Sequence, residues 1–109
     1  DGDGFEQTGW TVHYFHIGTQ GRVPLGTQVA AGDVIGYASC EGGVTSGTHF
    51  HIARRYNGVW IGAAGRIPFD LGGWIASSYG TVYDGTLTKD GKTVEAYDGR
   101  ADFNKIGSD

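Results

Sequence analysis

The 109-residue sequence contains no methionine, only two prolines and a single cysteine. With Cys40 alone, an internal disulfide and a Cys-x-x-Cys metal site are both excluded, so we expect Cys40 either to pair with a cysteine upstream or to be a small buried side chain. No apolar run is long enough to cross a bilayer, so no membrane span is predicted. The net charge of −4, with no basic cluster beyond Arg54-Arg55, argues against a nucleic-acid partner.

Glycine and aromatic residues are abundant instead: 21 glycines, six tyrosines, five phenylalanines and three tryptophans. Interspersed with short runs of Val, Ile and Thr, this composition predicts an all-β protein with tight turns. No stretch has the apolar spacing and end signals of a helix. Strands are expected within residues 9–18, 80–87 and 92–97, with a hairpin turn at Asp90-Gly91.

Two of the four histidines, His49 and His51, are separated by one residue. On a strand, His49, His51 and Ala53 would share one face, and Phe50 and Ile52 would share the other, which we expect to be buried. Two imidazoles facing a common space suggest a metal-binding or catalytic site. A chance pair of surface histidines is the alternative that has to be weighed against it.

A third candidate, His16, ends the predicted strand that begins near Trp10. Regular alternation places Val12, Tyr14 and His16 on one face and His13 on the other, so only one of these two histidines can face the pair at 49 and 51. We expect His13 to be a structural or surface residue. His16, His49 and His51 could hold zinc together or divide into ligands and acid–base groups, and their order in the sequence leaves both possibilities open.

The segment between these strands has the composition of a scaffold and a loop. Residues 22–37 predict brief strands joined by tight turns, with Asp33 as a turn residue. Residues 39–48 predict a loop that leads into the histidine pair, and Glu41 is the carboxylate nearest to that pair in sequence. The opening Asp1-Gly2-Asp3-Gly4 resembles part of a calcium loop, but further ligands are missing, so a turn is the preferred interpretation.

Three segments, in this order and at this spacing, resemble the second half of a lysostaphin-type zinc endopeptidase. They are Tyr14–Ile17 with its Tyr-x-His motif, the Val- and Gly-rich scaffold Val23–Gly36, and Ser46–His51 with its Gly-x-His-x-His motif. The resemblance covers about residues 10–55. It implies an antiparallel β-sheet core of the duplicated-hybrid-motif, barrel-sandwich-like type. It also implies a Zn²⁺ cofactor, peptidoglycan peptides as substrate, and an extracellular or cell-envelope location in a bacterium.

The resemblance also assigns roles: His51 matches a zinc ligand, and His49 and His16 match catalytic histidines. Tyr14 and Thr48, beside these residues, are the candidate substrate contacts. The family's other two ligands come from an upstream His-x-x-x-Asp segment, which this sequence lacks. We therefore expect residues 1–62 to be the C-terminal part of a peptidase domain and residues 63–109 a β-rich, hairpin-containing extension. By itself, this chain is expected to be inactive, either as a fragment or as a relative that lost the metal.

Two alternatives to a peptidase remain. A non-catalytic β module could bind cell-wall glycan or a protein partner through Trp10, Trp60 and Trp74. A lipoyl-type carrier would need a modified lysine at a hairpin tip, and its candidates, Lys89 and Lys92, lie far from the scaffold in sequence.

Overall fold

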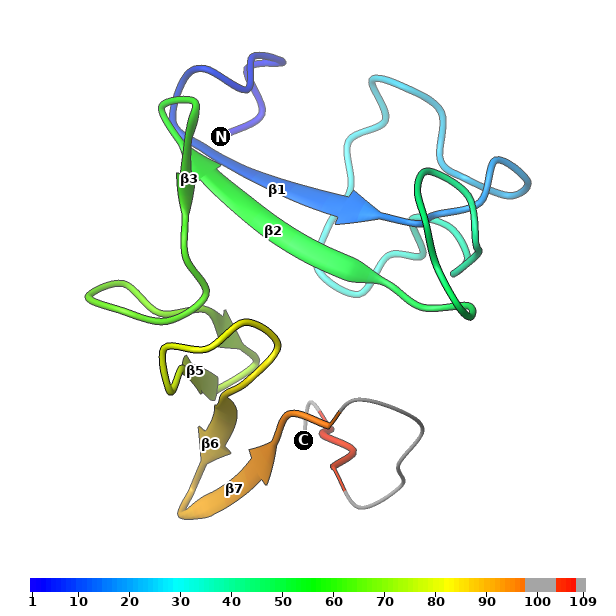
Figure 1. Cartoon of the computed structure of the whole chain (residues 1–109). Helices are drawn as coiled ribbons and strands as arrows, with labels where there is room; N and C mark the ends of the chain where they lie inside the picture. Colours follow the sequence, from blue (N-terminus) through cyan, green and yellow to red (C-terminus); the bar gives the residue numbers. More distant parts are fainter. Residues whose placement is uncertain (98–103, 108–109) are drawn as a thin grey trace. The chain divides into compact units, whose positions relative to one another are not determined.

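The computed structural model describes residues 1–97 and 104–107, and this part of the chain contains strands and turns but no helix. The prediction of an all-β fold is confirmed. The chain divides into two compact units, Asp1–Ile61 and Gly62–Asp109. Each unit carries one antiparallel sheet (Figure 1). The sheet of the first unit contains β1 (Trp10–Phe15), β2 (His51–Tyr56) and β3 (Val59–Ile61). The sheet of the second unit contains β4 (Asp70–Leu71), β5 (Trp74–Ser77), β6 (Thr86–Lys89) and β7 (Lys92–Glu95).

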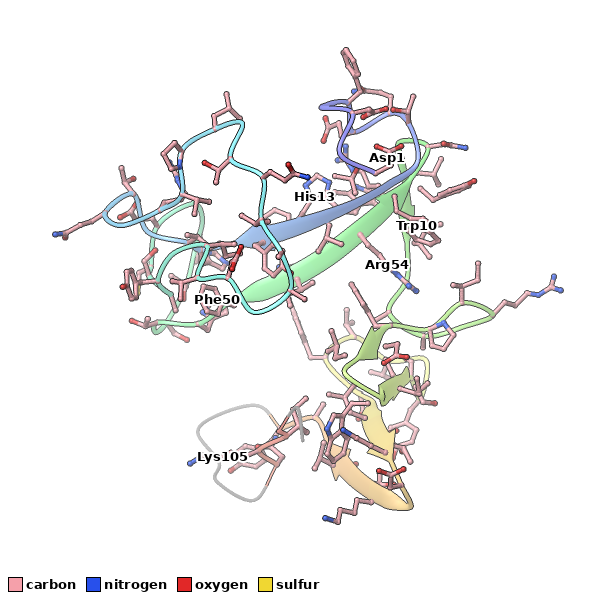
Figure 2. All side chains as sticks on the ribbon, turned by 180° about the vertical axis from the view of Figure 1, so that it is seen from behind. Asp1, Trp10, His13, Phe50, Arg54 and Lys105 are labelled. Carbon is pink, nitrogen blue, oxygen red and sulfur yellow. The ribbon has the colours of Figure 1, made fainter. Side chains whose placement is uncertain are left out.

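The first sheet has the order β1-β2-β3, so β2 lies in its centre. Residues directly opposite each other in an antiparallel pair point to the same face. The register therefore defines two faces. One face carries His13, Phe15, His51, Arg55 and Trp60. The other carries Trp10, Val12, Tyr14, Ile52, Arg54 and Tyr56. Figure 2 shows Trp10 near one end of the β1–β2 pair and Phe50 near the other.

The strand predicted for residues 9–18 is shorter than expected and ends at Phe15. The reason is that His16 has a φ of 64°, which takes the backbone out of the extended region and ends the alternation of side chains. The expected grouping of His16 with Val12 and Tyr14 is therefore wrong.

Two further strand predictions need correction. In residues 22–37 the structure has turns but no strand. The two sides of this segment are connected by isolated backbone hydrogen bonds, such as the one from Val23 N–H to the Ile35 carbonyl at 3.0 Å. A strand requires a continuous ladder, which this segment does not make. Residues 81–83 form a loop, with Tyr83 at a φ of 62°, and the strand of this region is β6. The Asp90-Gly91 hairpin is confirmed, since both residues have the positive φ (49° and 76°) of a type I′ turn.

Few side chains are buried. Among the described residues, Trp74 is the buried hydrophobic side chain, with 7% of its surface exposed, and Arg54 is the buried charged one, also at 7%. Phe50 was expected on a buried face, but it is 49% exposed because it precedes β2. Cys40 is a free thiol in an exposed position, so the prediction of a small buried side chain is wrong.

Candidate active site

His16 and His49 come together where the end of β1 meets the loop that precedes β2. Ser39 connects them: its backbone N–H donates to the His16 carbonyl at 2.8 Å, its hydroxyl donates to the same oxygen at 3.0 Å, and it forms an isolated β-bridge with His49. The two imidazole rings are tilted by 44°, with their centroids 4.5 Å apart. The positive φ of His16, which ended the strand early, thus belongs to the geometry that places its ring beside His49.

Both rings of this pair are held through Nδ1 by backbone carbonyls. His16 Nδ1 lies 2.8 Å from the Glu41 carbonyl oxygen, and His49 Nδ1 lies 2.8 Å from the Gly47 carbonyl oxygen. Thr45 Oγ1 lies 3.1 Å from His49 Nδ1 and donates to the Gly47 carbonyl as well. Since a carbonyl can only accept, Nδ1 carries the hydrogen in each neutral ring. The lone pair of each ring is therefore on Nε2, where it can accept a proton.

His51 is held differently. It is the first residue of β2, exposed, and its ring stacks on Phe15 with centroids 4.9 Å apart and planes 28° apart. The expectation that His51 and Ala53 share a face agrees with the register, but His49 precedes the strand and is not part of that alternation. Within residues 1–97 and 104–107, no group of three or more His, Cys, Asp or Glu could hold a metal ion. The three imidazoles therefore do not complete a zinc site among the described residues.

The candidate substrate contacts lie in different places. Tyr14 is 49% exposed and lines a cavity of about 320 Å³. The same cavity is lined by Phe15, His16, Ile17, Arg22, Glu41 and Gly42. The cavity is thus lined by one residue of the histidine pair, His16. Thr48 is exposed in the loop that leads to His49.

Sequence reasoning missed the residues that orient the pair, namely Ser39, Glu41, Thr45 and Gly47. Glu41 was noted for its carboxylate, yet it is its main-chain carbonyl that contacts His16. The contacts of Thr45 and Gly47 with His49 could have been expected from the sequence, because both residues lie within four positions of His49 in a loop of small residues. No sequence signal marks Ser39 or the Glu41 carbonyl, which approach His16 from more than twenty residues away.

The Glu41 carboxylate fixes the loop that supplies this carbonyl. It accepts hydrogen bonds from the Thr19 hydroxyl at 2.7 Å and from the Thr19 backbone N–H at 3.0 Å. These two bonds, with a smaller contribution from the charge of Arg22, lower the pKa of Glu41 below its ordinary value.

This lowered pKa predicts a pH dependence. A carboxyl whose pKa is lower in the folded state contributes stability above its unfolded pKa, and this contribution disappears as pH falls through the folded value. We expect protection of the Thr19 amide from hydrogen exchange to decrease below about pH 4, the ordinary range of the group. Glu41→Gln, which has no carboxyl to protonate at this position, should show no such decrease. An equal decrease in Glu41→Gln would assign the effect to another group.

The other residues singled out by sequence have structural contacts. His13 packs against Trp60 with ring centroids 5.0 Å apart, and its Nε2 lies 3.8 Å from Glu6 Oε2, which also pairs with Arg55 at 3.1 Å. The sequence predicted a structural or surface residue at this position. Asp33 accepts a hydrogen bond from the Ala30 backbone at 2.8 Å, consistent with a turn residue.

The N-terminal acidic stretch also forms a turn. The Asp3 carboxylate accepts hydrogen bonds from the Thr8 hydroxyl and from the Phe5 backbone N–H, and these bonds lower its pKa. Both of its oxygens are therefore engaged in the turn, and it belongs to no metal-binding group of the described residues.

The three tryptophans of the glycan-binding alternative are engaged within the chain. Trp74 is buried, and its indole N–H donates to the Gly107 carbonyl at 2.8 Å. Arg55 lies over the Trp60 ring at 4.0 Å, and Arg54 over the Trp10 ring at 5.4 Å. The lysines of the carrier alternative, Lys89 and Lys92, flank the β6–β7 turn, and Lys89 Nζ donates to the Gly72 carbonyl at 2.9 Å.

Comparison with known proteins identifies a partial similarity to a protease. The chain is 38% identical over 65 residues to Protease LasA of Pseudomonas aeruginosa strain UCBPP-PA14, and 35% identical over 65 residues to Protease LasA of strain PAO1. Each match covers 53% of this chain but only 15% of the relative. The chain thus spans a small fraction of the length of the curated relatives it matches. No family model and no solved structure matches it.

Proposed function

We propose that this chain is part of a zinc-dependent endopeptidase that hydrolyses peptidoglycan peptides. The observation that carries the proposal is the His16–His49 pair, whose rings lie 4.5 Å apart with both Nδ1 atoms held by carbonyls. Two neighbouring imidazoles with Nε2 lone pairs, one of them in a residue that lines a cavity, suit the transfer of protons to and from a peptide. The similarity to Protease LasA supports a proteolytic role, and the lysostaphin-type motifs support the substrate class.

In this proposal the residues of the chain have separate roles. His49 and His16 take and return a proton through Nε2 and stabilise the oxygen of the attacked peptide, while their Nδ1–H bonds keep the rings in place. His51 is one zinc ligand, and the remaining ligands come from outside the described residues. Zinc, when bound, supplies polarisation of the peptide carbonyl and a lower pKa for water. Tyr14 contacts the substrate from the cavity wall, and Thr48 from the loop.

The proposal predicts different behaviour for this chain and for a longer protein that contains it. One proposed ligand does not bind zinc tightly, so the 109-residue chain is expected to bind Zn²⁺ weakly in calorimetry and to leave peptidoglycan uncleaved. A protein with a His-x-x-x-Asp segment upstream of this chain is expected to bind one zinc ion and to release peptides. Absence of that segment from the encoding gene would contradict the proposal, as would tight zinc binding and hydrolysis by the 109 residues alone.

A non-catalytic module that binds cell-wall glycan or a protein partner is the second candidate. It is favoured by the lack of a three-ligand group among the described residues. Sedimentation of the longer protein with purified peptidoglycan separates the two candidates: binding without zinc and without hydrolysis supports the module.

Both candidates place the protein outside the cell or in the envelope of a bacterium. The described residues contain no helix long and apolar enough to span a membrane.

A further inference from the structure

The three histidines of the proposed site differ in how their rings are oriented. His16 and His49 are each fixed by a hydrogen bond from Nδ1 to a carbonyl oxygen. In the part of the chain that the structure describes, neither ring nitrogen of His51 has a hydrogen-bond partner. Histidines that bind metals are normally oriented by such a bond from the second nitrogen. A different contact must therefore set the ring plane of His51.

Phe15 makes that contact. It is directly opposite His51 in the β1–β2 register, so the ladder fixes both backbones and leaves only the two side-chain torsions of each residue to be set. The rings stack at 4.9 Å and 28°, which allows the imidazole to turn little without leaving the phenyl face. We propose that Phe15 is a positioning residue for His51, taking the place of the missing hydrogen bond.

The position of Phe15 is itself supported from the other side. The His13 ring lies 6.1 Å from the Phe15 ring at 18°, and Trp60 lies 5.0 Å from His13. Arg55, which pairs with Glu6 at 3.1 Å, lies over Trp60 at 4.0 Å. A row of rings, stacked from His51 through Phe15 to His13 and tilted by 52° at Trp60, thus runs along one face of the sheet. Since neither ring nitrogen of His51 has a hydrogen-bond partner among the described residues, one is available for a metal.

This inference rests on the proposed role of His51, so its first test needs neither metal nor hydrolysis. In the 109-residue chain, the phenyl ring current shifts the signals of ring protons stacked on it. We expect Phe15→Leu and Phe15→Ile to move the His51 ring-proton signals towards their unstacked positions and to leave those of His16 and His49 unchanged. Phe15→Tyr keeps the ring and should keep the His51 signals in place. Val12→Ala is the matched control, since it lies on the same strand but on the opposite face.

A second measurement concerns the metal. In the zinc-binding protein that contains this chain, Phe15→Leu is expected to weaken zinc affinity by about 10- to 100-fold, as loss of an orienting partner does, and Phe15→Tyr should restore it. Unchanged His51 signals in Phe15→Leu would overturn the inference, as would a similar shift of His51 in Val12→Ala. If the signals respond as expected but no form of the protein hydrolyses peptidoglycan, the proposed function fails while the positioning by Phe15 stands.

Discussion

Replacing His49 by alanine is expected to lower kcat/KM for peptidoglycan peptides by about 10²- to 10⁴-fold in the active protein that contains this chain, the range for loss of a general acid–base group. The physical reason is that His49 presents Nε2 as the proton acceptor, because Nδ1 is held at 2.8 Å from the Gly47 carbonyl. The measurement is the release of peptides from purified peptidoglycan by wild type and variant.

Two comparisons separate acid–base chemistry from metal binding and from folding. His49→Ala is expected to retain zinc, whereas His51→Ala is expected to lose both zinc and hydrolysis, since it removes a proposed ligand. Tyr79→Ala, an exposed aromatic residue in the other unit, should leave hydrolysis unchanged. Loss of zinc from His49→Ala would show that His49 is a ligand, and full activity of this variant would remove it from the mechanism.

Replacing Trp74 by alanine is expected to unfold the sheet of the second unit. Truncation of a buried tryptophan costs about 3–5 kcal/mol of unfolding free energy, which is a large share of the stability of a small domain. Trp74 is the buried hydrophobic side chain of the described structure, and few others could compensate for the cavity. Loss of hydrogen-exchange protection at the amides of β5 and β6 would report the unfolding.

The matched variant is Trp74→Phe, which retains much of the apolar volume but loses the N–H that donates to the Gly107 carbonyl. We expect a smaller loss of about 0.5–1.5 kcal/mol, the net contribution of one hydrogen bond, because Gly107 is exposed and water can reach its carbonyl. An unchanged melting transition in Trp74→Ala would show that Trp74 is not central to the second unit.

Some features follow from short-range rules and were therefore accessible from the sequence. The all-β class follows from composition, the Asp90-Gly91 turn from its residues' tolerance of positive φ, and the common face of His51 and Ala53 from the period of two. The lysostaphin-type motifs pointed to the three histidines before any geometry was known. Phe50 shows where such rules end: alternation predicted burial, but the strand starts one residue later, and its side chain is half exposed.

What the sequence determined by itself is thus the fold class, the hairpin and the identity of the candidate site residues, since each depends on neighbours within a few positions. Only the tertiary structure decided that His16 leaves the strand to meet His49, which carbonyls fix the two rings, and that His51 stacks on Phe15 instead. The physical reason is that His16 meets His49 and Glu41, and Phe15 meets His51, across more than twenty positions of sequence, whereas the Gly47 carbonyl that holds His49 is a local contact. The geometry of the long-range contacts depends on backbone angles and strand register, which no local pattern specifies.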